Sequence, residues 1–173
     1  MRALTILGVL FLVFSSQKAT ASQDKTQLRA HLNSLLLTEY YCEQHQAGSY
    51  LSYSVKKVLK RICEKNKKGV TFTEKLVLKI GGAVDSPMLR DKIKEKFQKK
   101  KLQTQSEVLK AFIDNEYDIL HRIHKSAKSF ENIEVLNYFY QLGYGHSLNW
   151  SFLIQLKGER LPTSLFNFNR EKN

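Results

Sequence analysis

The chain has 173 residues, of which 42% are hydrophobic, and its 28 Lys and Arg against 16 Asp and Glu give a formal net charge of +12. This length suits one domain with a sizeable core, and no repeat or low-complexity tract divides it. The charge predicts a partner with an anionic surface and says nothing about the fold.

The first 21 residues have the pattern of a cleaved secretory signal. A positive start at Arg2 precedes an apolar run from Leu4 to Phe14, and Ala19-Thr20-Ala21 supplies small residues for a signal peptidase. The run is too short to be a membrane anchor, and no later segment approaches a membrane span. We predict a signal peptide at 1–21 and a single secreted helical-bundle domain at 22–173. Cleavage would remove Arg2 and Lys18 and leave a charge of +10.

Apolar residues recur with a helical period nearly throughout, which predicts an all-α fold. Asp24 is a candidate N-cap for a first helix, and Gly48 with Ser49 marks the following turn. A second apolar stripe runs from Leu51 to Cys63, and the segment Asn66 to Gly69 is predicted to end that helix. Residues 73–80, before Gly81-Gly82, suit either a strand or a helix, and we favour a short helix.

Start and stop signals continue through the second half. Asp85-Ser86-Pro87 predicts a helix start with a capping side chain and proline in the first turn. Thr104 and Glu107 form a capping box for a helix through residue 127. Ser129 is a candidate cap for a further helix that Gly143 would end. Together, these helix signals predict an up-and-down bundle of about five amphipathic helices with an irregular aromatic C-terminal tail.

The two cysteines, Cys42 and Cys63, leave two states open. In an oxidising compartment two cysteines usually pair. In antiparallel helices joined near Gly48, however, Cys63 would lie roughly 12 Å beyond the level of Cys42. A bridge needs Cα atoms within about 7 Å. A disulfide and two buried thiols are therefore both compatible with the sequence.

No catalytic or metal site is recognisable. His121 and His124 can share a helix face with Asp118, but a metal site needs three or four converging ligands. Neither cysteine lies in a catalytic motif, and Gly81-Gly82 lacks the context of a phosphate loop. We expect a protein that is not an enzyme and that uses no metal or cofactor. Asn149-Trp150-Ser151 is a formal acceptor for N-linked sugar, and its occupancy stays open beside bulky apolar neighbours.

Two lysine-rich runs are the candidate binding surfaces. An ordinary solvated face is the alternative, but two such runs in a strongly basic chain favour a functional electrostatic surface. Lysine suits diffuse attraction better than bidentate recognition of one group. The runs comprise Lys56, Lys57, Lys60, Arg61, Lys67 and Lys68, and then Arg90, Lys92, Lys94, Lys96, Lys99, Lys100 and Lys101.

Aromatic and apolar residues crowd the last third of the chain. Trp150, Phe152 and Ile154, if exposed beside lysines, would form a membrane-seeking patch. Ordinary core packing is the alternative. Export from the cell argues against nucleic acid and favours anionic lipid or acidic glycoprotein as partner. A second copy of the chain, in a homodimer, is a further candidate partner.

The segment Asn137-Tyr138-Phe139-Tyr140-Gln141-Leu142, followed by a polar turn, an apolar stretch and a proline-containing tail, suggests a family. It resembles the C-terminal end of the abalone sperm acrosomal proteins, egg-lysin and its fusagenic paralogue. The likeness covers the organisation of the mature chain, and only the Tyr-Phe-Tyr segment matches residue for residue. It implies a five-helix bundle, storage in the acrosomal vesicle, and non-enzymatic action at fertilization.

Two roles follow from that resemblance. A lysin-type protein opens the egg vitelline envelope by stoichiometric binding of a glycoprotein, whereas the paralogue promotes fusion of sperm and egg membranes. Cys42, Cys63 and the more apolar tail depart from the lysin pattern and favour the paralogue. Its lysines would approach anionic head groups while apolar side chains perturb the bilayer. A cytokine-like receptor ligand is the alternative from outside the family, and a small secreted hydrolase is a third.

Overall fold

The computed structural model describes residues 2–98, 102–126, 130 and 132–158, with side chains from residue 23 onward. Within these residues it has five helices and no strand, which confirms the predicted all-α fold. The predicted signal at 1–21 and the aromatic tail at 159–173 lie outside the described side chains. The helices are α1 (Arg2–His45), α2 (Tyr53–Lys79), α3 (Ser86–Phe97), α4 (Gln105–Ser126) and α5 (Ile133–Lys157).

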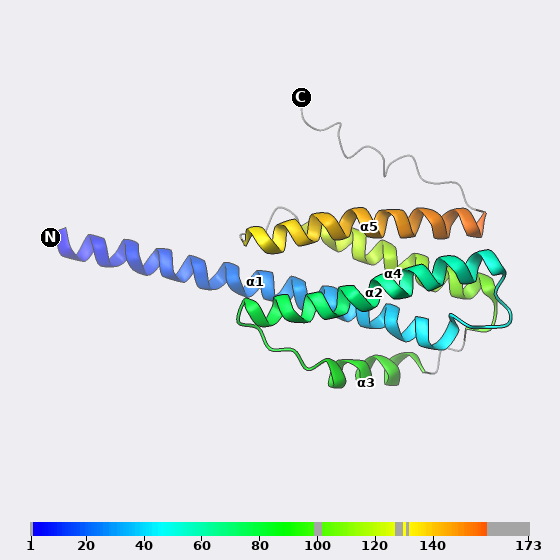
Figure 1. The fold of residues 1–173 in the computed structure, drawn as a ribbon. Helices are drawn as coiled ribbons and strands as arrows, with labels where there is room; N and C mark the ends of the chain where they lie inside the picture. Colours follow the sequence, from blue (N-terminus) through cyan, green and yellow to red (C-terminus); the bar gives the residue numbers. More distant parts are fainter. Residues whose placement is uncertain (1, 99–101, 127–129, 131, 159–173) are drawn as a thin grey trace, which may run out of the picture.

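Four of the helices form a bundle around the core. α1 packs against α2 and α4, and α5 packs against α4 and α2, so that α2 and α4 lie diagonally opposite each other (Figure 1). The chain runs alternately up and down through the five helices, as predicted. α3 lies outside the bundle on α1 and carries the chain back along it (Figure 1).

Two of the predicted helix starts are confirmed. The Asp85 carboxylate accepts a hydrogen bond from the Met88 backbone N–H at 3.0 Å, at the start of α3. Before α4, Glu107 accepts from the Thr104 backbone N–H at 3.0 Å, and the Thr104 hydroxyl accepts from the Glu107 backbone N–H at 3.3 Å. These bonds satisfy N–H groups that have no partner inside the helix.

Two other predicted starts are wrong. α1 continues through Asp24, whose buried carboxylate accepts a hydrogen bond from the Asn132 backbone N–H at 3.2 Å. Ser129 lies outside the described residues, and Asn132 caps α5 by accepting from the N–H groups of Glu134 and Val135. A capping side chain in a sequence marks a helix start only when the residues before it are not helical themselves.

The predicted helix ends at Gly69 and Gly143 are also wrong. α2 runs on to Lys79 and is capped by Ile80, so residues 73–80 complete α2 and are not a separate helix. α5 runs on to Lys157 and ends at Gly158, which adopts the left-handed φ of 79°. A glycine inside a helix costs about 1 kcal/mol relative to alanine, an amount that tertiary packing can offset. The Gly69 carbonyl, for example, accepts a hydrogen bond from the Tyr138 hydroxyl of α5 at 3.4 Å.

Cys42 and Cys63 form a disulfide, with their Cα atoms 5.8 Å apart. The expected offset between them does not arise, because the connection is seven residues long, 46–52, and α2 begins beyond the end of α1 (Figure 1). Because of this overhang, Cys63, the tenth residue after the start of α2, lies level with Cys42. The bond clips α1 to α2 near one end of the bundle.

Candidate functional site

The exposed side of α2 is a continuous cationic surface, which we call the basic face. It contains Lys57, Lys60, Arg61, Lys65, Lys67, Lys68, Lys75 and Lys79, with Lys56 half-buried at its edge. Glu64 is the exposed acid among them. Because α2 is one uninterrupted helix, the basic face runs from Lys57 to Lys79 over roughly 33 Å. The face is therefore longer than the predicted run of residues 56–68.

The basic face forms because the apolar residues of α2 recur with a helical period and occupy the other side of the helix. Val55, Leu59, Ile62, Val70 and Val77 are buried on the opposite side of α2. Within the described part of the chain, Lys79 is the one residue of the basic face with an ion pair, to Glu134 at 2.6 Å. Glu64 is the one exposed carboxylate of α2 among the remaining cations, so most of their charge acts on whatever approaches from solvent.

The described part of the second predicted run, on α3, is a weaker cationic surface than the basic face. Arg90 donates to Glu39 at 2.8 Å, and this hydrogen bond is the main cause of the raised pKa of Arg90. Asp91 and Glu95 alternate with the exposed Lys92, Lys94 and Lys96. Lys99, Lys100 and Lys101 lie outside the described residues. In the described part of α3, cations and acids are therefore interspersed.

Two of the three membrane-contact candidates are corrected. Trp150 and Ile154 are each 5% exposed and belong to the main core cluster. The reason is that α5 continues past Gly143, which turns both residues toward the bundle axis. Phe152 is 39% exposed, and the Arg61 guanidinium lies 5.4 Å from its ring centroid. Phe72 of α2 is 47% exposed and was not predicted.

The predicted glycosylation acceptor is inaccessible. Asn149 is 6% exposed, within α5. Its Nδ2, the atom that would carry the sugar, donates to Glu116 Oε1 at 3.4 Å. A sugar at this position would have to displace the packing between α4 and α5.

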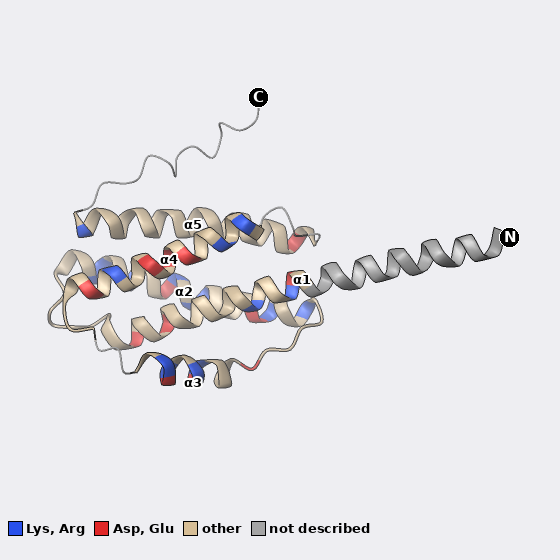
Figure 2. Ribbon diagram, turned by 180° about the vertical axis from the view of Figure 1, so that it is seen from behind, with Lys and Arg blue, Asp and Glu red and all other residues tan. Residues whose placement is uncertain are grey.

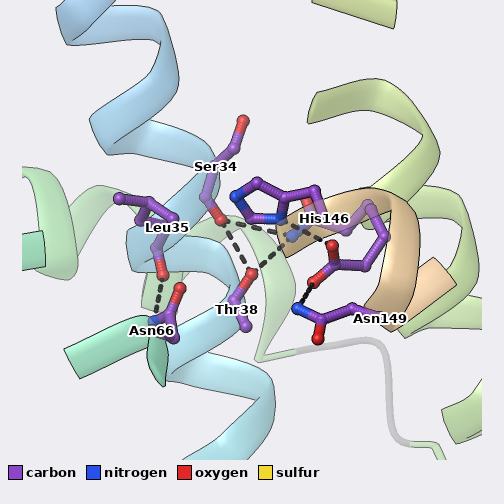
Figure 3. Close-up of polar contacts among 8 residues, drawn as sticks. Ser34, Leu35, Thr38, Asn66, His146 and Asn149 are labelled. Atoms are coloured by element: carbon purple, nitrogen blue, oxygen red, sulfur yellow. Dashed lines mark hydrogen bonds and ion pairs between the residues drawn. The ribbon is translucent and has the colours of Figure 1, made fainter. Parts of the chain in front are cut away.

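A buried polar cluster, unpredicted from the sequence, crosses the core beside Asn149. His146 Nδ1 lies 2.6 Å from Glu116 Oε2, and both side chains are buried (Figure 3). Across the bundle, Asn115 Nδ2 donates to the Thr38 hydroxyl at 2.7 Å, and Arg122 donates to the Ser34 hydroxyl at 2.7 Å. These contacts join α1, α4 and α5 by groups that the low-polarity interior makes costly to leave unpaired.

His31 of α1 packs beside this cluster. Its ring centroid is 5.8 Å from that of His146, at nearly a right angle, and its Nε2 has no hydrogen-bond partner in the described part of the chain. Burial lowers the pKa of His31 well below the ordinary value of 6.5, and the nearby His146 and Arg122 lower it further. His31 is therefore a neutral histidine at neutral pH.

A pocket of about 180 Å³ lies between α2 and α5, and we call it the α2–α5 pocket. Exposed Lys65 and Gln141 line its rim, and the buried Glu116 and His146 line its floor. Gly145 forms part of one wall, where an added Cβ would meet no atom within 4 Å. Lys65 also belongs to the basic face, so the pocket adjoins the cationic surface.

The Ser34 and Thr38 hydroxyls of the cluster do not line the α2–α5 pocket. The residues that line the pocket include no Ser, Thr or Cys that His146 could activate as a nucleophile. Within the described residues, no three His, Cys, Asp or Glu side chains converge as metal ligands. His121 and His124 are exposed on α4.

One sequence signal would have located the cluster. Glu116 lies four residues after Phe112 and three and seven residues before Ile119 and Ile123, so it interrupts the apolar stripe of α4. An acid on an apolar stripe needs a partner from another helix. Its partner, His146, is 30 residues away, and only the bundle brings them together.

Comparison with protein-family models, curated proteins and solved structures found no match for this chain. None of the helical segments that the structure describes combines the length and the hydropathy of a membrane-spanning helix.

Proposed function

We propose that this chain is a secreted, non-enzymatic protein that binds anionic membrane surfaces through the basic face of α2. The observation that carries the proposal is the row of exposed cations along one helix, which has a single ion pair within the described residues. A lysine near an anionic bilayer contributes about 1 kcal/mol to binding. Several lysines on one face can therefore add up to stable membrane binding, although none makes a specific contact.

The geometry also supplies apolar contacts beside the charge. Phe152 and Phe72 are partly exposed on α5 and α2, the two helices whose seam adjoins the basic face. Aromatic side chains partition into the headgroup region of a bilayer, where basic residues engage phosphates. This pairing supports a membrane as the anionic partner over a soluble polyanion.

A more specific form of the proposal uses the resemblance to the abalone sperm acrosomal proteins. In that version the chain is a sperm acrosomal protein that acts at fertilization, and its binding promotes fusion of sperm and egg membranes. A lysin-type role on the egg envelope would use the same basic face on an acidic glycoprotein. Helical cytokines have two long crossover connections, whereas α3 supplies one here, and this topology disfavours the cytokine-like alternative.

The test compares two triple variants that remove equal charge. Lys57, Lys60 and Lys68 of α2 are changed to Gln in one, and Lys92, Lys94 and Lys96 of α3 in the other. Binding is measured by co-sedimentation with vesicles of phosphatidylserine and phosphatidylcholine. We expect the α2 variant to bind roughly 100-fold more weakly than the wild type and the α3 variant to lose much less.

Two results would contradict the proposal. One is equal loss in both variants, which would show that net charge alone matters. The other is binding that persists at 1 M salt, where screening shortens electrostatic interactions to about 3 Å. Lipid mixing between anionic vesicles tests the fusagenic version separately, because binding without mixing would leave the basic face as a docking surface only.

A further inference from the structure

The α2–α5 pocket lies where a bound bilayer would face the protein. Its rim residue Lys65 belongs to the basic face, and the helices that form its walls also carry the exposed Phe72 and Phe152. A membrane that contacts the basic face therefore reaches the mouth of the pocket. This placement distinguishes it from cavities elsewhere on the molecule.

The size of the pocket sets the class of ligand. A cavity of about 150 Å³ holds a molecule of benzene size, so the volume of about 180 Å³ here admits a group of several non-hydrogen atoms. A lipid acyl chain is too long for that space, and a phosphate with a short polar substituent fits it. The bare helix backbone at Gly145 keeps this volume open.

The polar groups of the pocket suit an anion. Lys65 offers an ammonium at the rim, and the Gln141 side chain adds an amide donor, whereas Asn66 Nδ2 already donates to the Leu35 carbonyl at 2.9 Å. The Glu116 oxygens engage His146 and Asn149, so the carboxylate is already partnered. His146 Nδ1 donates to Glu116, and its Nε2 makes no hydrogen bond within the described residues. An imidazole that donates from Nδ1 can accept at Nε2, which suits the amino group of a serine headgroup.

We propose that the α2–α5 pocket holds the anionic headgroup of one membrane phospholipid. This inference rests on the proposed function, because it assigns a specific lipid contact to a protein that first binds the bilayer by diffuse attraction. Lys65 pairs with the phosphate at the rim, and His146 binds the inner end of the headgroup. The basic face then supplies affinity and the pocket supplies selectivity.

The experiment follows backbone amide signals by NMR during titration with short-chain dihexanoyl phosphatidylserine below its micelle concentration. The wild type is compared with Gly145→Leu, which fills the pocket, and with Gln155→Leu, a control at an exposed position of the same helix. Leucine is a better helix former than glycine, so α5 is expected to persist in the filled variant. We expect saturable shifts at Gly69 and Gly145 in the wild type, similar shifts at Gly69 in Gln155→Leu, and at least a tenfold loss of affinity in Gly145→Leu.

Parallel arms separate the outcomes. Inorganic phosphate that reproduces the same shifts with equal affinity would overturn the lipid assignment in favour of a free oxyanion site. Absence of shifts around the pocket, together with normal vesicle binding, would overturn the pocket proposal and leave the proposed function standing. Loss of Lys65 alone, in Lys65→Gln, should weaken the lipid titration at least fivefold, and an unchanged affinity would contradict its role.

Discussion

His146 Nδ1 and Glu116 Oε2 lie 2.6 Å apart in the core, between α5 and α4. The glutamate side chain is 1% exposed and the histidine side chain 9%. Removing one partner of a buried pair leaves the other without compensation, which typically costs 3–5 kcal/mol. The contact between His146 and Glu116 therefore contributes to the stability of the bundle.

We expect Glu116→Leu to lower the free energy of unfolding by about 3 kcal/mol, measured by urea denaturation. The double variant Glu116→Leu/His146→Leu should lose less than the two single variants together, because each single variant leaves the other member of the pair buried and unpaired. Additive losses would show that the two side chains act independently.

Stability should fall in acid because of His31. Its folded pKa lies well below 6.5, chiefly through burial and then through His146 and Arg122. The unfolded chain therefore takes up a proton on this residue at a higher pH than the folded chain does. The stability that neutral His31 contributes is full above pH 6.5 and is lost as the pH falls below that value.

The check is denaturation at several pH values between 7.5 and 5 for the wild type and His31→Gln. Each excess proton bound by the unfolded state steepens the loss by at most about 1.4 kcal/mol per pH unit. The wild type should show the steeper slope, since the glutamine at residue 31 does not titrate. Parallel slopes would mean that groups other than His31 control the acid response.

The disulfide should stabilise the bundle by closing a loop. Cys42 and Cys63 are 21 residues apart in sequence, and closing a loop of that size contributes about 3 kcal/mol in the chain-entropy model. We expect the Cys42→Ser/Cys63→Ser variant to unfold at a lower denaturant concentration, because its free energy of unfolding is lower by about 3 kcal/mol. Reduction of the wild type should match the double variant, and an unaffected midpoint would contradict the bond.

Asn149 should carry no sugar when the chain is made in a glycosylating cell. Its Nδ2 is enclosed and bonded to Glu116, so a transferase can reach it only before the chain folds. Mass spectrometry of the secreted protein, with and without a glycosidase that removes N-linked sugar, should give the same mass. A decrease that Asn149→Gln abolishes would contradict the buried position.

Periodicity and capping predicted much of this fold, because amphipathic spacing and the Thr104–Glu107 box are local signals. They failed at Gly69 and Gly143, since tertiary contacts decide whether a helix survives a glycine. The sequence left open whether Trp150 is exposed or packed in the core, because the outcome depends on where α5 ends. The basic face was predicted only to Lys68, and the partnership of Glu116 with His146 needed the folded bundle to be seen.

Charge is distributed unequally across the bundle, and this affects how the molecule arrives at a surface. α2 carries nine Lys and Arg against two acids, whereas the diagonally opposite α4 carries three against four. Figure 2 shows the acids of α4 and the nearly uncharged length of α5. Such an arrangement gives the described bundle a dipole moment across its width. In the field of an anionic surface, the molecule would rotate during diffusion so that α2 leads, and encounters would become productive more often than random tumbling allows.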